Sequence, residues 1–125
     1  MISEVVLSVG SNCGSENVRT ACEWLGKILD KPELSGLYQT PAVNGGMRDY
    51  VNAVVSGQTE LTVDALNARL KEYELMCGRD ENSRRSGIVP VDIDIVIVDG
   101  KVIREWDFRQ SFFRIGYSEL FSPVV

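Results

Sequence analysis

The stretch PVDIDIVIVDG, residues 90–100, has the β-branched composition of a buried β-strand and yet carries two acids near its start. Successive side chains on a strand point to opposite faces, so Asp92 and Asp94 are predicted to share one face. The same face continues with the apolar Val96 and Val98, and the odd-numbered residues form the other. The two carboxylates lie roughly 6.5 to 7 Å apart on such a strand. They repel each other unless a positive group lies close to both.

The elements around this strand predict the fold class. Asp99-Gly100 is a two-residue hairpin turn into Lys101–Arg104. The order of elements is β-α-β-β-α-β with an added hairpin, which is typical of a ferredoxin-like α+β sandwich with an antiparallel sheet. The preceding elements are strands at 2–9, 33–40 and 49–57, a helix with Ser15 as its N-cap that Pro32 closes, a helix capped by Thr62 and ended by Gly78, and a charged loop at 79–87.

Length and composition are those of an ordinary globular domain. The chain has 125 residues, of which 44% are apolar and 25% charged, so we expect one domain over residues 1–125. The apolar runs are too short to cross a bilayer, and no signal-peptide pattern opens the chain. We therefore expect a cytoplasmic protein that does not contact a membrane. The net charge of −5 disfavours nucleic acid as a partner.

The aromatic tail that begins at Trp106 has no clear periodicity. We expect it to pack as an irregular layer on the domain or on a partner. A monomer is the first expectation, and a homodimer formed through this tail is the alternative. The aromatic residues of the tail are Trp106, Phe108, Phe112, Phe113, Tyr117 and Phe121.

The residue types that are scarce exclude several chemistries. The chain has no histidine, which removes Ser-His and Cys-His nucleophiles and the usual zinc sites. Cys13, Cys22 and Cys77 are an odd number at wide spacing, so neither a disulfide framework nor a CxxC metal site is expected. Any chemistry must therefore use carboxylates, cations, amides and hydroxyls.

Asp92 and Asp94 have the ligand type that Mg²⁺ prefers, since this ion takes one or two carboxylates together with substrate phosphates. Arg79, Arg84 and Arg85 lie in the loop just before them, where guanidinium groups can bind phosphate oxygens. The alternative is a solvent-facing strand start beside a solvated loop. Asn52 lies in a β-branched run, so its amide needs a hydrogen-bonding partner if buried, and the edge of a flat heterocycle is one such partner.

Five motifs occur together: GSN at 10–12, YQTPA at 38–42, DYVNAVV at 49–55, YELMCGR at 73–79 and VDIDIVIVDG at 91–100. With this spacing, the chain from about Val5 to Ile103 resembles the 6-hydroxymethyl-7,8-dihydropterin pyrophosphokinase family of folate biosynthesis. The resemblance implies a ferredoxin-like fold. It also implies transfer of the β,γ-pyrophosphoryl group of ATP to the hydroxymethyl oxygen of a pterin, with release of AMP.

The resemblance also implies a role for particular residues. Asp92 and Asp94 would hold two Mg²⁺ ions and, with Arg79, form the catalytic set. Arg79, Arg84 and Arg85 would contact the ATP phosphates. Glu74 and Ile95 would lie near adenine and ribose. The pterin pocket would be lined by Thr40, Pro41, Val43, Tyr50 and Asn52.

The chain departs from the family pattern in two places. Glu81 and Ser86 stand where the family has an arginine and a tryptophan, and Ile88-Val89 replaces a Pro-Arg. Residues 110–112 replace a Pro-His-Pro segment and a further arginine. Arg84, Arg85, Arg109 and Arg114 are the candidates to supply the missing charges. The second hypothesis is a catalytically impaired pterin- or nucleotide-binding module, and the third is an interaction domain that dimerises through its tail.

Overall fold

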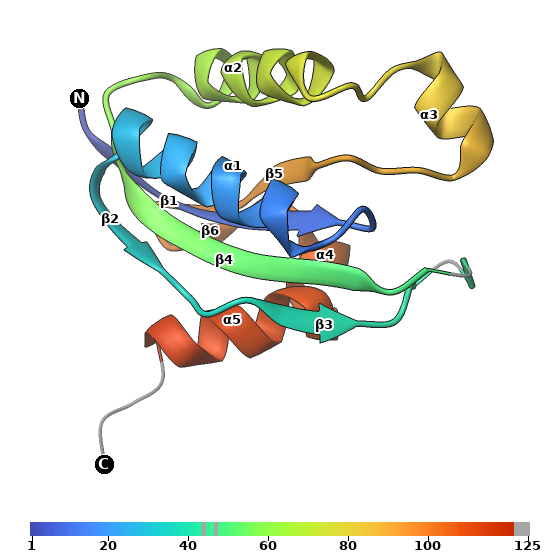
Figure 1. The fold of residues 1–125 in the computed structure, drawn as a ribbon. Helices are drawn as coiled ribbons and strands as arrows, with labels where there is room; N and C mark the ends of the chain where they lie inside the picture. The colour runs from blue at the N-terminus through green and yellow to red at the C-terminus, as the bar shows by residue number, and fades with distance from the viewer. Residues whose placement is uncertain (44, 47, 122–125) are drawn as a thin grey trace.

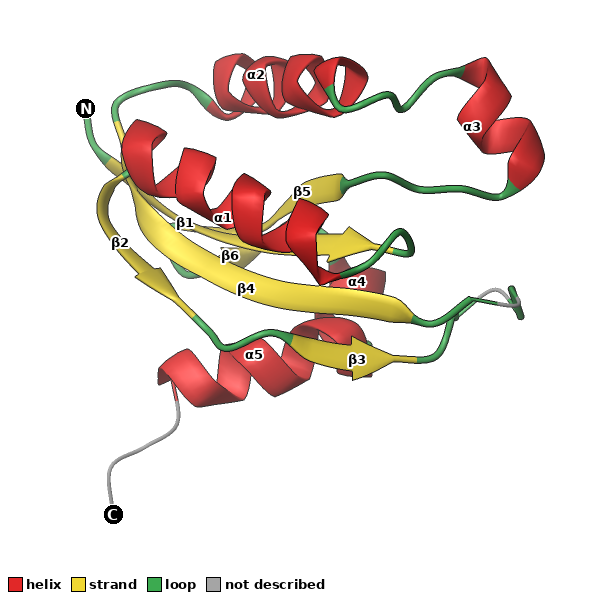
Figure 2. Cartoon of the chain, in the orientation of Figure 1, coloured by secondary structure: helices red, strands yellow, loops and turns green. Residues whose placement is uncertain are grey.

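One antiparallel sheet organises the fold, and helices cover both of its faces (Figures 1 and 2). The computed structural model describes residues 1–43, 45–46 and 48–121. The strands are β1 (Ser3–Ser11), β2 (Asp30–Leu34), β3 (Tyr38–Thr40), β4 (Tyr50–Thr59), β5 (Asp92–Val98) and β6 (Lys101–Val102). The helices are α1 (Ser15–Ile28), α2 (Val63–Met76), α3 (Glu81–Ser86), α4 (Glu105–Arg109) and α5 (Ser111–Phe121).

The strand order is β2-β4-β1-β5-β6, and β3 also pairs with β4. The central strand β1 is antiparallel to β4 on one side and to β5 on the other. This arrangement confirms the predicted ferredoxin-like class. The single strand predicted at 33–40 is divided into β2 and β3. Ser35 lies between them and ties the chain to β4, because its Oγ accepts a hydrogen bond from the Val54 N–H at 2.8 Å.

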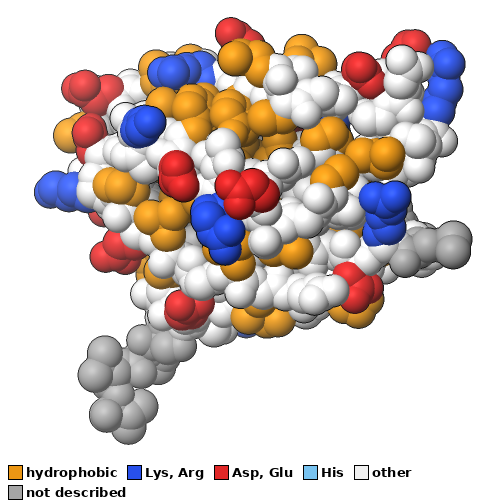
Figure 3. Space-filling view, viewed as in Figure 1, with side chains coloured by type: hydrophobic (Ala, Val, Ile, Leu, Met, Phe, Trp, Pro, Cys, Tyr) orange, Lys and Arg blue, Asp and Glu red, His pale blue; other side chains and the backbone are white. Residues whose placement is uncertain are grey.

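The first face of the sheet is covered by α1 and α2, which build the larger core. Their buried side chains recur at helical spacing, as predicted. The predicted cap of α2 is confirmed, because Thr62 Oγ1 accepts a hydrogen bond from the Ala65 N–H at 3.1 Å. The predicted cap of α1 at Ser15 was wrong, because Ser15 is the first helical residue and the N-cap is Gly14, which has no side chain to form a cap. Trp24 of α1 stacks on Tyr73 of α2 with ring centroids 4.2 Å apart. Hydrophobic side chains gather over these helices (Figure 3). Pro32, predicted to close the first helix, lies within β2.

The opposite face is covered by α4 and α5, so the prediction of an irregular aromatic tail was wrong. Phe113, Tyr117 and Phe121 are four residues apart and form a row along α5, with successive ring centroids 5.4 and 5.0 Å apart. Phe113 is fully buried against this sheet face. The helix lies close to the strands because Gly116 has no side chain, and a Cβ there would lie 2.6 Å from Val54 Cγ2.

The β1–β5 pairing contains a bulge that changes the predicted alternation of β5. Leu7 pairs with Ile95 and Val6 pairs with Ile97, which leaves Val96 without an opposite residue. Val96 and Ile97 therefore both pack under α4 and α5, whereas Val98 packs on the side of α1 and α2. The bulge lies after the two aspartates, so they keep the common face that the sequence predicts.

Residues 79–87, predicted as a loop, contain the short helix α3. Asp80 and Ser83 form a capping box at its start, and Gly87 ends it with a positive φ of 73°. The predicted hairpin turn is confirmed, because Asp99 and Gly100 have φ values of 49° and 79°. Within the described ranges, the structure contains no helix with the length and apolarity needed to cross a membrane.

Candidate active site

A cavity of about 210 Å³ opens at one end of the sheet, between the strands and the start of α4 and α5. It brings the predicted pterin residues and the two predicted metal ligands into one space. Thr40 comes from β3, Tyr50 and Asn52 from β4, and Asp92 and Asp94 from β5. The other lining residues are Ser8, Val9, Gly10, Pro41, Val43, Arg104, Trp106, Asp107 and Phe112.

The two aspartates have cationic partners. Arg79 Nη1 lies 2.6 Å from Asp92 Oδ1. Lys71 Nζ lies 3.2 Å from Asp94 Oδ1 and 4.0 Å from Asp92 Oδ1. Sequence reasoning identified Arg79 and missed Lys71. A signal for it was its position three residues before Glu74 on the same helix, which places both side chains on the face that meets β5.

Glu74 is a buried anchor for these cations. Its Oε2 accepts hydrogen bonds from the Ile93 N–H and from Lys71 Nζ, both at 2.9 Å, and its Oε1 lies 2.8 Å from Arg79 Nη1. The Ile93 N–H on β5 therefore has a side chain of α2 as its hydrogen-bond acceptor. The structure places Glu74 against the strand, 4% exposed, and the Ile95 side chain in the core under α1 and α2.

Asp94 is mostly buried, and burial raises its pKa above the usual range of a carboxyl group. The charge of Asp92 raises this pKa further, whereas Lys71 and Arg104 lower it. Arg104 Nη1 lies 4.0 Å from Asp94 Oδ1, and its Nε lies 3.2 Å from Asp107 Oδ2. Sequence reasoning missed Arg104, which the β5–β6 hairpin brings back over the acids. The two aspartates therefore lie beside three cations.

The amide of Asn52 is 2% exposed, and its Nδ2 donates a hydrogen bond to Thr40 Oγ1 at 2.7 Å. Gly10 leaves space beside it, because a Cβ on Gly10 would lie 3.1 Å from Asn52 Oδ1 and 3.6 Å from Tyr50 Cδ2. The close approach of Asn52 and Tyr50 therefore explains why the GSN motif begins with a glycine. A flat ligand with hydrogen-bonding groups along one edge fits next to this amide and the tyrosine ring.

Aromatic rings from two distant parts of the chain line the cavity. Burial raises the pKa of the Tyr50 phenol above its usual value. Phe112 lies at the start of α5, and the Tyr38 hydroxyl donates a hydrogen bond to its carbonyl at 2.6 Å. Trp106 lies beside Phe112 with ring centroids 6.1 Å apart. Sequence reasoning gave these two tail aromatics no place in the pocket, because nothing in their spacing predicted that the tail returns to the first strands.

The remaining arginines predicted for phosphate binding are spread widely. Arg84 lines a second cavity together with Arg79. Arg85 is exposed and pairs with Glu81 at 3.4 Å. Arg109 pairs with Glu105 at 3.5 Å, and the Arg114 guanidinium lies 5.0 Å from the centre of the Phe108 ring. Neither Arg109 nor Arg114 lines the cavity that holds the aspartates.

The protein is therefore a ferredoxin-like α+β protein with a small-molecule cavity at one end of its sheet. Two aspartates line this cavity, and three cations lie beside them. The family model for 7,8-dihydro-6-hydroxymethylpterin-pyrophosphokinase matches residues 6–120, and the chain belongs to this family. A folate synthesis bifunctional protein of Arabidopsis thaliana is 34% identical over 97 residues, which cover 74% of this chain and 20% of that protein.

A folate synthesis bifunctional protein of Chlamydia trachomatis is 35% identical over 101 residues, which cover 74% of this chain and 22% of that protein. The chain therefore spans about a fifth of the length of the curated relatives that it matches. The family membership agrees with the resemblance found in the sequence.

Proposed function

We propose that the protein transfers pyrophosphate from ATP to 6-hydroxymethyl-7,8-dihydropterin and releases AMP, as a Mg²⁺-dependent pyrophosphokinase of folate biosynthesis. The observation that carries this proposal is the single cavity that contains Tyr50, Asn52, Asp92 and Asp94. The Asn52 amide and the Tyr50 ring can bind a heterocycle, and the two aspartates can bind a metal–phosphate complex. Membership of the pyrophosphokinase family supports the same reaction.

The carboxylate pair suits Mg²⁺. Asp92 and Asp94 both line the cavity, and Lys71 Nζ lies within 4.0 Å of an Oδ1 atom of each. No group of three or more His, Cys, Asp or Glu side chains placed to hold a metal occurs in the described part of the chain. Mg²⁺ does not require such a cage, because substrate phosphates and water complete its coordination. Bound here, two Mg²⁺ ions would neutralise the charge that develops on the phosphates.

In the proposed reaction, no side chain of the protein forms a covalent bond with a substrate. The hydroxymethyl oxygen attacks the β-phosphorus of ATP, the bond from that phosphorus to the α,β-bridging oxygen breaks, and AMP leaves with the oxygen. The hydroxyl proton passes to solvent. Asn52 and Tyr50 orient the pterin, while Lys71, Arg79 and Arg104 supply positive charge beside the aspartates. Positioning and electrostatics are therefore the contributions of this chain.

The test is AMP formation by the purified protein from ATP and 6-hydroxymethyl-7,8-dihydropterin, with and without Mg²⁺. The expected result is Mg²⁺-dependent AMP and one pyrophosphorylated pterin per AMP. Asp94→Asn should abolish the activity. Asp64→Asn, which removes an exposed acid at the start of α2, should leave it unchanged. AMP production that persists in Asp94→Asn would contradict the proposed role of the aspartates.

The second candidate is a pterin- or nucleotide-binding module that has lost turnover. The departures at Glu81 and Ser86 favour it, because α3 brings a glutamate and a serine where the family has an arginine and a tryptophan. Isothermal titration with the dihydropterin and a non-hydrolysable ATP analogue separates the two candidates. Pterin binding without any AMP formation would select the binding module.

We further propose that residues 1–125 form one pyrophosphokinase-like domain that acts as a monomer in the cytoplasm on ATP and a pterin. Two observations support this assignment. The family match spans nearly the whole chain, which supports a single domain, and the three cysteines are free thiols, which fits a reducing compartment. Sedimentation of the purified chain tests the monomer against a homodimer that uses the exposed aromatic residues Trp106 and Phe121.

A further inference from the structure

A second cavity, of about 520 Å³, lies beside the first and contains an unusual set of charges. Its walls are the connection from β3 to β4 and the segment that includes α3. Three arginines line it, and none of its described lining residues is an aspartate or a glutamate. The lining residues are Asn12, Ala42, Gly46, Arg48, Tyr50, Arg79, Arg84, Ser86, Gly87, Ile88 and Val89. We call this cavity the arginine groove.

Hydrogen bonds hold the floor of the arginine groove in place. Asn12 Nδ2 donates to the Gly87 carbonyl at 2.8 Å, and its Oδ1 accepts from the Val89 N–H at 2.7 Å. The Asn12 N–H donates to the Val89 carbonyl at 3.1 Å, and Ser11 Oγ donates to the same carbonyl at 3.2 Å. The segment after α3 is therefore fixed to the end of β1. The wall of the arginine groove that follows α3 is therefore held in place by the sheet.

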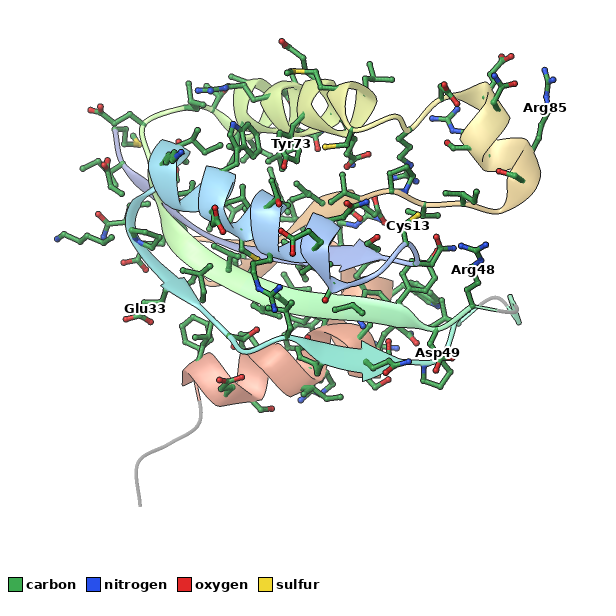
Figure 4. All side chains as sticks on the ribbon, viewed as in Figure 1. Cys13, Glu33, Arg48, Asp49, Tyr73 and Arg85 are labelled. Carbon is green, nitrogen blue, oxygen red and sulfur yellow. The ribbon has the colours of Figure 1, made fainter. Side chains whose placement is uncertain are left out.

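Two of the three guanidinium groups have no ion pair with any residue that the structure describes. Arg79 is held by Asp92 and Glu74. Arg48 and Arg84 form no salt bridge with any residue in the described ranges. Figure 4 shows Arg48 on the β3–β4 connection, at the end of the molecule where α3 lies, and Arg85 pointing away on the outer side of that helix. Cations that face one cavity without a carboxylate repel each other, and a polyanion relieves that repulsion.

We propose that the arginine groove binds the polyphosphate of the nucleotide, with Arg48 and Arg84 as its contacts. This inference rests on the proposed function and identifies Arg48, to which the family resemblance gives no role. The position agrees with transfer at the aspartates, because Tyr50 lines both cavities and Arg79 lines the arginine groove while it contacts Asp92 at 2.6 Å. Arg48 thereby supplies, from a different loop, positive charge in place of the family arginines that Glu81 and Val89 replace.

Isothermal titration with inorganic tripolyphosphate tests the arginine groove without turnover. We expect the wild-type protein to bind tripolyphosphate and ATP more tightly than AMP, with affinity that falls as salt is added. Arg48→Ala and Arg84→Ala should each weaken tripolyphosphate binding roughly tenfold, because each removes a charge-assisted hydrogen bond. Arg69→Ala is the control, since it removes the same charge from an exposed position on α2. Thermal unfolding of each variant confirms that it is folded.

Three results would overturn the proposal. One is tripolyphosphate binding no tighter than AMP binding, and another is an effect of Arg48→Ala or Arg84→Ala no larger than that of Arg69→Ala. The third is an unchanged KM for ATP in Arg48→Ala when AMP formation is intact, which would reject the groove and leave the proposed function standing. Conversely, tripolyphosphate binding that depends on both arginines, without AMP formation, would support the groove and reject the transfer reaction.

Discussion

Arg79 joins two carboxylates from different elements, since its Nη1 lies 2.6 Å from Asp92 Oδ1 on β5 and 2.8 Å from Glu74 Oε1 on α2. Glu74 also binds Lys71, which reaches Asp94. The aspartates, the two cations and the buried glutamate are therefore one connected network. The buried Glu74 holds the orientation of the two cations that neutralise the aspartates.

Glu74→Ala should destabilise the protein strongly. The substitution leaves the Ile93 N–H without its acceptor and removes the partner of two cations, so we expect the free energy of unfolding to fall by about 2 to 4 kcal/mol. Glu72→Ala, at an exposed position on the same helix, is the matched control and should change it by less than about 0.5 kcal/mol. Urea unfolding measures both. Equal effects would show that Glu74 is not an anchor.

Asn52→Leu should weaken binding of the pterin and retain the fold. Leucine has a similar size but removes the amide that donates to Thr40 and faces the cavity. We expect dihydropterin affinity to fall at least about tenfold, because the hydrogen-bonding groups along the edge of the pterin lose their protein partner. Fluorescence titration measures it. Gln58→Leu, near the other end of β4, is the control, and an equal loss there would contradict a specific role for Asn52.

The close contact of α5 with the sheet can be tested at Gly116. A Cβ at this position would lie 2.6 Å from Val54 Cγ2 and 2.9 Å from Tyr38 Oη, so Gly116→Ala should cost about 1 to 3 kcal/mol of stability. Gly26→Ala on α1 meets nothing within 4 Å and should be neutral or stabilise by up to about 1 kcal/mol. Thermal unfolding distinguishes them. A neutral Gly116→Ala would mean that α5 lies farther from the strands.

Cys22 should be unreactive in the folded protein, and it should make stability depend on alkaline pH. Burial, together with a smaller effect of the charge of Glu23, raises the pKa of this thiol from 9.0 to about 11. The unfolded chain therefore loses the proton first, so this contribution to stability is complete below pH 9 and disappears as the pH rises through 11.

Unfolding curves between pH 8 and 11 measure this dependence, with a loss of about 2 kcal/mol from the thiol. Cys22→Ala should flatten the curve over the same range. Iodoacetamide at pH 8 should modify the exposed Cys13 and Cys77 before Cys22. Modification of Cys22 at the rate of the other two would contradict its burial.

Local sequence patterns were sufficient for most of the fold. The periodicity of α1 and α2, the cap at Thr62 and the turn at Asp99-Gly100 depend on neighbours in the chain, and the structure has all of them. The predicted single strand at 33–40 failed because its division depends on Ser35 bonding to Val54, nineteen residues away. The alternation pattern did not predict the bulge at Val96 for a similar reason, because the bulge depends on the register between β5 and β1.

The sequence by itself determined the class of fold, the acidic pair and the residues around Asn52, because each is carried by a short motif or by regular spacing. Only the tertiary structure decided that Lys71 and Arg104 lie beside Asp94, that Phe112 lines the cavity and that Arg48 and Arg84 line a second cavity together. These residues meet through sheet order and helix packing across large separations in the chain. Such contacts leave no periodic signal in a single sequence, because neither partner constrains the residues next to the other.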